Sequence, residues 1–561
     1  MTLTLIIIQA GVRLCTQIIR TCIAAMLFIT VFFILFTLCK SERPNIVLII
    51  ADDLGWNDVG FHGLNQIPTP NMDALASSGI MLHNYYVTPI CTPSRSAMMT
   101  GKYPIHTGMQ HTVIFGAEPR GLPLSEKILP QYLKDLGYKT HLVGKWHLGS
   151  YKREYLPMNR GFDSHVGFWS GKIDMYDHTN QEKNYWGFDF RRGFSIAHDL
   201  FGHYATDIYT NEAVKVINSH NKSAPLFLMV SHSAVHSGNP SEPIRAPEGL
   251  LSNFTHINDF QRRKFAAVLT KLDESVGEVV EALQSRGLLE NSVIIFTTDN
   301  GGPAEGFNDN RASNYPLRGV KNTLWEGGVR GAGFLWSPLI EKKSRIAKQM
   351  FHLVDWLPTL LNVAGMNVSS LQGLDGIDQW ESLSKDLKSE RVSILHNIDD
   401  TYGSAAITVD KWKLHKGTNY NGAWDGWYGP SGREGDYDSR AVQAARAARA
   451  LNELGLMPDL DTILKLREEA TVKCDTSRHI ACNPLKSPCL FNIEEDPCEM
   501  RNLADAEPTI LRSMLEELEK MNKTAIPPNN KPLDPHGDPK FWGRIITNFG
   551  DYENLNANTL C

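Results

Sequence analysis

Long runs of apolar residues recur between residues 45 and 298 and mark the expected strands. The runs are Asn45–Ala51, Leu226–Val230 and Ser292–Thr298, each rich in Val, Ile, Leu or Phe. A continuous apolar run of this length is typical of a parallel strand that is buried on both faces of a sheet. The pattern therefore predicts a central, mostly parallel sheet.

Between these runs the apolar residues follow a helical period. The clearest case is Asp259 to Arg286, which ends before Gly287, a residue suited to stop a helix. Its apolar stripe consists of Phe265, Val268, Leu269, Leu272, Val276, Val279 and Leu283. Strands that alternate with helices predict an α/β layered domain.

The pattern changes after about residue 395. Two short strand-like segments, residues 405–409 and 412–414, precede a loop rich in Gly, Tyr and Trp. An Ala/Arg-rich helix is expected from about Ser439 to Leu454, followed by a cluster of cysteines. We therefore predict a large domain over residues 44–395 and a smaller C-terminal α+β domain over residues 396–561, packed on the first.

The N-terminal residues 1–39 have the pattern of an export signal. Thr21 to Cys39 carries no charge and follows Arg13 and Arg20. This favours a cleaved signal peptide, and a signal anchor is the alternative because the run is long enough to span a bilayer. We expect the rest of the chain in the secretory pathway, and membrane attachment only if the segment stays uncleaved.

Glycosylation sequons and cysteines agree with export. Four Asn-x-Ser/Thr sequons begin at Asn221, Asn253, Asn367 and Asn522. Four cysteines near the C-terminus, Cys474, Cys482, Cys489 and Cys498, predict disulfides of undetermined pairing, since their spacing does not suit a zinc site. Cys561 is a candidate for an unpaired cysteine.

Composition excludes some classes of partner. The chain has 561 residues, is 42% apolar and 21% charged, and carries a net charge of −6. No basic run or aromatic stripe indicates nucleic-acid binding. An anionic substrate would need local basic residues, because the overall charge does not attract it.

Acidic residues follow two of the predicted strands. Asp52 and Asp53 come after the first strand, and Asp299 and Asn300 come after the third. The carboxyl ends of strands in an open α/β sheet meet at the ligand crevice, and such oxygen ligands suit Ca²⁺ or Mg²⁺. Either pair alone is explained as a helix cap or turn, but two pairs together with the motif described next favour a metal site.

The stretch Cys91-Thr92-Pro93-Ser94-Arg95 carries the most specific signal. Pro93 predicts a turn, and Ser94 to Met99 predicts a capped helix start. The stretch resembles the C-x-P-S-R signature of the sulfatases, in which the cysteine is oxidised to formylglycine, an aldehyde that serves as the nucleophile. Taken alone, a buried free cysteine would explain it as well.

Further segments resemble sulfatase signatures in the same order. Residues 137–149 end in Gly-Lys-Trp-His-Leu-Gly, and Lys145 and His147 alternate there on an extended segment, so both can face one side. Lys321 matches another family lysine. After the strand at Leu226, the family pattern favours His236 over His232, which we expect to satisfy local hydrogen bonds.

The resemblance covers about residues 44–400 and is greatest to the arylsulfatase B branch. It implies an alkaline-phosphatase-like layered fold and calcium-dependent hydrolysis of sulfate esters, such as N-acetylgalactosamine 4-sulfate in glycosaminoglycans. One Ca²⁺ would be held by Asp52, Asp53, Asp299, Asn300 and the modified residue 91. A formylglycine-generating enzyme would be a partner during maturation, and the lysosome or the extracellular space the destination.

The resemblance also implies the role of each catalytic side chain. Arg95 would orient the hydrated aldehyde, and Lys145 and Lys321 would neutralise sulfate oxygens. His147 would take the proton that triggers sulfate release, and His236 would protonate the leaving alcohol. Two alternatives remain: a phosphatase or phosphodiesterase on the same scaffold, and a catalytically silent protein that binds sulfated glycans.

Overall fold

The structure, a computed structural model, describes residues 43–552 and eight isolated positions before them (7, 8, 11, 13, 20, 21, 23 and 26). Contacts divide the chain into Met1–Arg43 and Pro44–Cys561. Apart from those isolated positions, the signal segment expected over residues 1–39 lies outside the described residues, and so does Cys561. None of the described helices is both long and apolar enough to cross a membrane.

The largest sheet in the described chain has ten strands, of which the central five are parallel. In spatial order they are β13 (Arg345–Ala347), β2 (Ile80–Leu82), β12 (Gly333–Trp336), β11 (Ser292–Thr298), β1 (Asn45–Ala51), β10 (Leu226–Ser231), β4 (Lys139–Lys145), β5 (Ser164–Phe168), β8 (Arg191–Arg192) and β9 (Ser195–Ile196). The three apolar runs form β1, β10 and β11, which lie side by side. The predicted mostly parallel sheet is confirmed.

Both faces of this sheet are buried. Along β1, Val47 and Ile49 pack into one core, and Ile46 and Leu48 pack into the other, as the alternation of a strand requires. The first face is covered by α2 (Pro70–Ser78), α5 (Ala205–Ser219) and α6 (Phe260–Ser285). The second face is covered by α3 (Cys91–Thr100), α4 (Leu129–Asp135) and α8 (Trp356–Val363).

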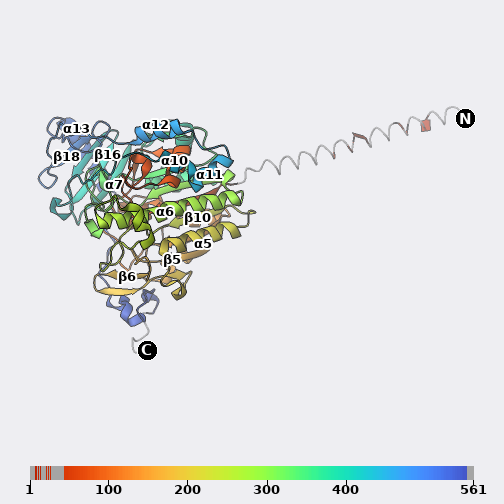
Figure 1. Ribbon diagram of the computed structural model, residues 1–561, viewed down its shortest axis with the longest axis horizontal. Helices are drawn as coiled ribbons and strands as arrows, with labels where there is room; N and C mark the ends of the chain where they lie inside the picture. Colours follow the sequence, from red (N-terminus) through yellow and green to blue (C-terminus); the bar gives the residue numbers. More distant parts are fainter. Residues whose placement is uncertain are drawn as a thin grey trace. The chain divides into compact units, whose positions relative to one another are not determined.

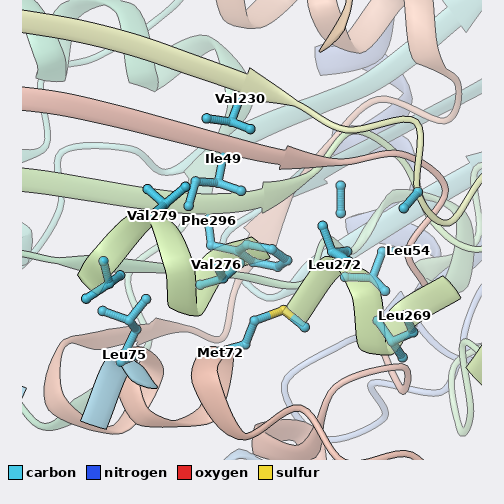
Figure 2. Packing of buried hydrophobic residues seen from close by; sticks show 14 of the residues in the cluster. Ile49, Leu54, Met72, Leu75, Val230, Leu269, Leu272, Val276, Val279 and Phe296 are labelled. Atoms are coloured by element: carbon cyan, nitrogen blue, oxygen red, sulfur yellow. The ribbon is translucent and has the colours of Figure 1, made fainter. Parts of the chain in front are cut away.

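Helix α6 has the amphipathic face that the sequence predicts. Asp259 caps it by accepting hydrogen bonds from the backbone N–H groups of Gln261 and Arg262, and Gly287 beyond its end has φ +59°. All seven residues of the apolar stripe are buried. Figure 2 shows the stripe packed between the sheet and α2, with Leu269, Leu272, Val276 and Val279 against Met72 and Leu75 of α2 and Ile49 and Phe296 of the sheet.

The C-terminal third of the chain contributes a second, four-stranded antiparallel sheet, of which β16 and β18 are labelled in Figure 1. Its strands are β15 (Ser393–Asp399), β16 (Ser404–Val409), β17 (Trp412–Lys416) and β18 (Cys489–Asn492), and α13 (Pro508–Asn522) packs against them. The two short strands expected after residue 395 are β16 and β17. Strand β15 begins at Ser393, so the predicted boundary at residues 395/396 falls inside it.

The Ala/Arg-rich segment differs from expectation. It forms two helices, α10 (Ser439–Ala444) and α11 (Arg446–Glu453), separated by the extended residue Ala445. With α12 (Leu460–Ala470), they pack on α2 and α6 rather than on the C-terminal sheet. The small buried side chains of Ala447, Ala448 and Ala450 allow that close approach. The C-terminal third of the chain therefore contributes to both cores.

The described chain also contains shorter strands and helices. They are β3 (Tyr85–Tyr86) paired with β14 (Phe351–His352), β6 (Thr179–Glu182) paired with β7 (Tyr185–Phe188), α7 (Glu326–Val329) and α9 (Trp380–Lys385).

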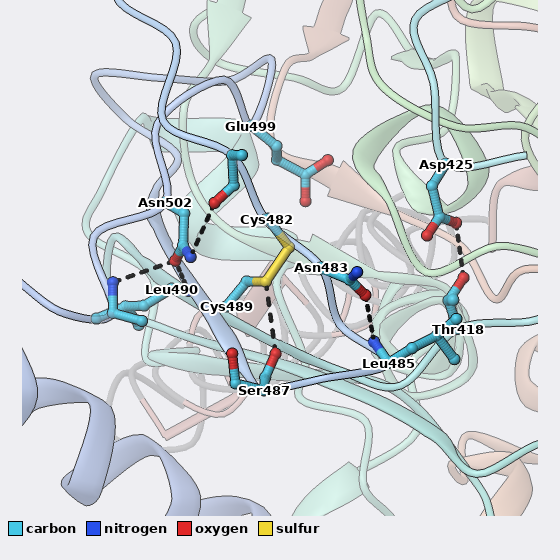
Figure 3. Close-up of a disulfide and its surroundings, with 12 residues drawn as sticks. Thr418, Asp425, Cys482, Asn483, Leu485, Ser487, Cys489, Leu490, Glu499 and Asn502 are labelled. Carbon is cyan, nitrogen blue, oxygen red and sulfur yellow. Dashed lines mark hydrogen bonds between the residues drawn. A yellow bond between two sulfur atoms is a disulfide. The ribbon is translucent and has the colours of Figure 1, made fainter. Parts of the chain in front are cut away.

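The four clustered cysteines form two disulfides, Cys474–Cys498 and Cys482–Cys489. This confirms the predicted disulfide framework and leaves none of these sulfurs for zinc. Figure 3 shows Cys482–Cys489 beside Asn502, whose side-chain oxygen accepts a hydrogen bond of 3.1 Å from the backbone N–H of Leu490. Cys91 is the free cysteine within the described residues.

A buried ion cluster joins the C-terminal sheet to the rest of the fold. Lys413 of β17 lies 2.9 Å from a carboxylate oxygen of Glu326 in α7 and 2.9 Å from one of Glu499, and all three side chains are fully buried. Burial raises the pKa of Glu499 to about 7 despite the opposing charge of Lys413. The lysine thus holds two carboxyl groups together that would otherwise repel.

We predict that Lys413→Met destabilises the protein by about 3–5 kcal/mol, because breaking a buried pair leaves uncompensated charge. Urea unfolding followed by tryptophan fluorescence measures the loss. The matched control is Lys416→Met at the exposed end of the same strand, which should change the free energy of unfolding by less than about 0.5 kcal/mol. Equal stability of the two variants would contradict this role of Lys413.

Candidate active site

Four neighbouring parallel strands end at one edge of the large sheet, and each carries a polar residue there. Asp299 and Asn300 follow β11, and Asp52 and Asp53 follow the adjacent β1. Ser231 ends β10, and Lys145 ends β4. All of these residues are buried. The two acidic pairs lie in contact: the backbone N–H of Asp53 donates to Asp299 at 3.2 Å, and the Asn300 amide donates to Asp53 at 2.8 Å.

Arg95 of α3 ties these strand ends together. Its guanidinium donates to Asp299 Oδ2 at 2.9 and 3.1 Å and to Ser231 Oγ at 2.7 Å, and it lies 3.7 Å from Asp52 Oδ1. Burial opposes its charge, but Asp299 and Asp52 outweigh burial and raise its pKa. Its hydrogen bonds go to Asp299, to Ser231 and, at 3.4 Å, to the backbone carbonyl of Lys145. These contacts position Asp299 and the ends of the neighbouring strands.

Cys91 is the first residue of α3, so the helix begins three residues earlier than the expected start at Ser94. Pro93 lies inside the first helical turn instead of in a preceding turn, where its missing N–H costs no hydrogen bond. The Cys91 side chain is 1% exposed, and burial raises the pKa of the thiol to about 12. Unmodified Cys91 is therefore a neutral thiol.

Two buried lysines neutralise the first acidic pair. Lys145 Nζ lies 2.7 Å from Asp52 Oδ2, and Lys321 Nζ lies 2.6 Å from Asp53 Oδ1. Burial would raise the pKa of Asp53, but the charges of His236 and Lys321 outweigh it and lower the pKa to about 2. Burial and the charge of Asp52 raise the pKa of Asp299 to about 6.

The donor set fits a divalent cation. One ligand atom from each of Asp52, Asp53, Cys91 and His236 lies within 4.8 Å of the others. Asp52 Oδ1 and Asn300 Oδ1 are buried and have no hydrogen-bond partner, which leaves their lone pairs free. Carboxylate and amide oxygens are the ligands that Ca²⁺ and Mg²⁺ prefer. His236 was not in the ligand set expected from the sequence.

The two candidate acid–base histidines have defined hydrogen-bond roles. His147 Nε2 donates to the carbonyl of Ile114 at 3.0 Å, so its buried and unpartnered Nδ1 is the acceptor. His236 Nδ1 donates to the carbonyl of Ser237 at 2.6 Å, and its Nε2 faces Lys321 Nζ at 3.2 Å. Burial lowers the pKa of both imidazoles, that of His236 to about 3.

His232 lies away from this constellation. It is fully buried, and its Nε2 lies 3.2 Å from the Ser275 hydroxyl of α6. Burial lowers the pKa of His232 to about 3. It has the environment of a core histidine with a local hydrogen bond.

A cavity of about 260 Å³ opens onto the constellation. The lining includes Cys91, His147, His236 and Lys321, which the sequence had singled out. It also includes Phe115, Lys172, Glu182, Asn308 and Asp309, which it had not. Ser231 was missed as well, although it ends a buried strand in the same way as the acidic pairs. Lys172 and Glu182 lie beyond β5 and in β6, and no motif marks them.

Comparisons with known proteins agree with this geometry. The sulfatase family model matches residues 44–366, more than half of the chain. The chain belongs to the sulfatase family. Mouse arylsulfatase J is 39% identical over 510 residues, 90% of this chain and 80% of that protein. Human N-acetylgalactosamine-6-sulfatase is 30% identical over 403 residues, 68% of this chain and 73% of that protein.

A solved structure has a similar architecture. The crystal structure of Ps i-CgsB in complex with k-i-k-neocarrahexaose is 26% identical, with a TM-score of 0.67 over 87% of this chain and 94% of that one. This sulfatase is accordingly a sulfuric ester hydrolase. Its cavity, which joins buried lysines to a metal-competent group, is suited to a sulfate group.

The geometry distinguishes the two histidines of the loop after β10. We predict that His236→Gln lowers kcat/KM for a sulfated sugar by about 100-fold or more, because it removes an acid–base group from the cavity. The loss should be smaller for nitrophenyl sulfate, whose leaving group needs no proton. His232→Gln should instead lower the melting temperature and leave the ratio of the kcat/KM values for the two substrates as in the wild type. The reverse pattern would assign the role to His232.

Proposed function

We propose that this sulfatase hydrolyses sulfate esters of glycans, of the N-acetylgalactosamine 4-sulfate type, through a formylglycine at position 91 and one Ca²⁺. The observation that carries the proposal is the position of Cys91. It lies at the cavity that Lys321 and His236 also line, next to the carboxylates of Asp52 and Asp53. The glycan part is supported by the relative named N-acetylgalactosamine-6-sulfatase, whose name gives the 6 position, and by the structure solved with k-i-k-neocarrahexaose.

The cationic side chains would bind and orient the sulfate. Lys321 and Lys145 hold their ammonium groups beside Asp53 and Asp52, close to residue 91. Their charges would be shared between those carboxylates and the sulfate oxygens. Formylglycine supplies, when hydrated, two hydroxyls on one carbon, one to attack sulfur and one to release sulfate.

The histidines would move protons at stated atoms. His147 Nδ1 is a buried acceptor without a partner, so it is available to take a proton from a hydroxyl on residue 91. His236 Nε2 faces Lys321 Nζ at 3.2 Å. A proton held between these two atoms would be the source for the leaving sugar oxygen.

The cation would be held by Asp52, Asp53 and residue 91, with Asp299 and Asn300 adjoining them. Without it, three carboxylates (Asp52, Asp53, Asp299) face three cationic groups (Arg95, Lys145, Lys321), and the charges cancel. A bound divalent cation would leave a surplus of positive charge, which is what binding a sulfate monoester requires.

Both alternatives are less well supported. A phosphatase on this scaffold would use a serine or threonine nucleophile and two zinc ions with several histidines. The metal-competent group found among the described residues contains one histidine, His236, and a cysteine. A silent glycan-binding protein would not need an acceptor histidine and two lysines around residue 91. Assay of an aryl sulfate against an aryl phosphate separates all three.

Export to the lysosome or the extracellular space is part of the same proposal. Its support is the pair of disulfides and the exposure of the sequon residues Asn221, Asn253 and Asn367. The fourth sequon residue, Asn522, is half-buried and lines a separate cavity beside α13.

We predict that residue 91 is largely formylglycine in protein made through a eukaryotic secretory pathway, as measured by mass spectrometry of its peptide. Cys91→Ser keeps one oxygen at this position, so it could accept sulfate but could not release it. We expect no steady-state turnover of aryl sulfate and at most one sulfate ester per chain. Two results would contradict the mechanism. One is an unmodified cysteine at position 91 in protein co-expressed with the formylglycine-generating enzyme, and the other is sustained turnover by Cys91→Ser.

We predict that exhaustive chelation removes activity and that Ca²⁺ restores it, because Asp52 and Asp53, with Asp299 adjoining them, would hold a hard cation. Asp52→Asn should lose both activity and tightly bound calcium, measured by elemental analysis. The control Asp410→Asn lies in the exposed turn between β16 and β17 and should keep both. Full activity in metal-free protein would show that the cation is not needed.

A further inference from the structure

One cationic side chain lines the cavity outside the group that would hold the sulfate. Lys172 follows β5 and lines the same cavity as Cys91 and Lys321. The cavity volume of about 260 Å³ is close to the range of about 300–1,000 Å³ typical of small-molecule sites. There is room for part of the substrate beyond the sulfate.

The Lys172 ammonium has unused hydrogen-bonding capacity. Its one hydrogen bond in the described structure goes to the carbonyl of Gly238, at 3.2 Å. Within residues 43–552, no carboxylate oxygen lies within 4.0 Å of its Nζ, although an ammonium has three donors. The side chain is half-buried, and burial lowers its pKa while the charge of Glu182 opposes that effect.

The nearby carboxylate of Glu182 is committed elsewhere. One of its oxygens accepts a hydrogen bond of 2.7 Å from the backbone N–H of Gly116, and the other accepts one of 2.8 Å from Asn180. These bonds engage both oxygens of Glu182, which acts on Lys172 through its charge but forms no ion pair with it. A half-buried ammonium without an ion pair is unfavourable. An anionic group of a ligand would supply the missing ion pair and accept the remaining hydrogen bonds of Lys172.

A merely structural role for Lys172 is less well supported. Gly238 lies in the loop that carries His236, and Lys172 could serve to hold that loop. However, the loop has stronger ties: Ser237 donates to the carbonyl of Asn308 at 2.7 Å, and Asn239 bonds to Gln181 at 2.8 Å and to the Thr179 hydroxyl at 2.9 Å in β6.

We propose that Lys172 binds a second anionic group of the substrate, either the carboxylate of a uronate or a second sulfate, on the saccharide whose sulfate ester is cleaved. The proposal rests on the function proposed above and adds the class of saccharide to it. Lys172 then selects acidic oligosaccharides over neutral sulfated sugars, while Lys145 and Lys321 serve the scissile sulfate.

The test compares matched disaccharides that carry N-acetylgalactosamine 4-sulfate. One has a uronate, the second has that carboxylate reduced to an alcohol, and the third is the reduced form with a second sulfate. With wild-type protein we expect kcat/KM to be about tenfold or more higher for an acidic form than for the reduced one, as a charge-assisted hydrogen bond supplies. Lys172→Met should abolish this preference, and Lys172→Arg should keep most of it.

The control Lys465→Met lies at an exposed position of α12 and should keep the wild-type preference. Either the uronate form or the form with a second sulfate should lose its advantage over the reduced disaccharide in Lys172→Met. The form that does so identifies the anionic group that Lys172 binds. An equal loss on all three disaccharides would make Lys172 a support of the His236 loop and overturn the proposal. No effect on any of them would also overturn it.

Failure of the proposed catalytic function gives a different result. In that case wild-type protein would turn over none of the three disaccharides or nitrophenyl sulfate. Calorimetric binding of the uronate and the reduced disaccharides, in Cys91→Ala with and without Lys172→Met, then tests Lys172 alone. A preference for the acidic disaccharide of about tenfold that disappears with Lys172→Met supports the proposal, and equal affinities reject it.

Discussion

The buried guanidinium of Arg95 is the interaction on which the site depends. Buried charges are unfavourable unless they are paired with good geometry, and Arg95 pairs with Asp299 while it also reaches Asp52 and Ser231. It thereby joins the ends of three neighbouring strands to the helix that begins with Cys91. Without the positive charge of Arg95, the carboxylates of Asp52 and Asp299 would repel each other. The edge of the sheet that carries the metal-competent group would then lose its order.

The fold supplies the rigid support that such a charge cluster requires. Strand β1 is buried on both faces, so the positions of Asp52 and Asp53 are fixed by two separate cores. Backbone hydrogen bonds fix these residues further. The backbone N–H of Asp52 donates to the carbonyl of Ala234 at 2.9 Å, and that of Asp299 donates to the carbonyl of Ala51 at 3.1 Å. The second sheet adjoins the same region through Lys413, whose partner Glu326 lies in α7, five residues after Lys321.

The sequence alone predicts the parts of the structure that depend on short-range pattern. Continuous apolar runs indicated the buried strands, and the polar residues after them indicated which side chains meet, because parallel strands share an edge. The break at Ala445 had no local signal, since alanine favours helix, and the packing of α11 on α6 is a long-range contact. Lys172 was missed for a similar reason: a loop brings it to the cavity, and one lysine carries no motif.

The cavity therefore has two parts of different origin. The end that would hold the sulfate is built from strand ends and a helix start, and its charges depend on one another, so that changing one affects all. Other parts of the lining come from loops: Lys172 after β5, residues 237–243 after His236, and Asn308 and Asp309, which both have positive φ. Loops accept substitutions more readily than strands that are buried on both faces. Relatives with the same chemistry can thus differ in the saccharide that they bind, and the loop wall of this chain is where its own preference would be encoded.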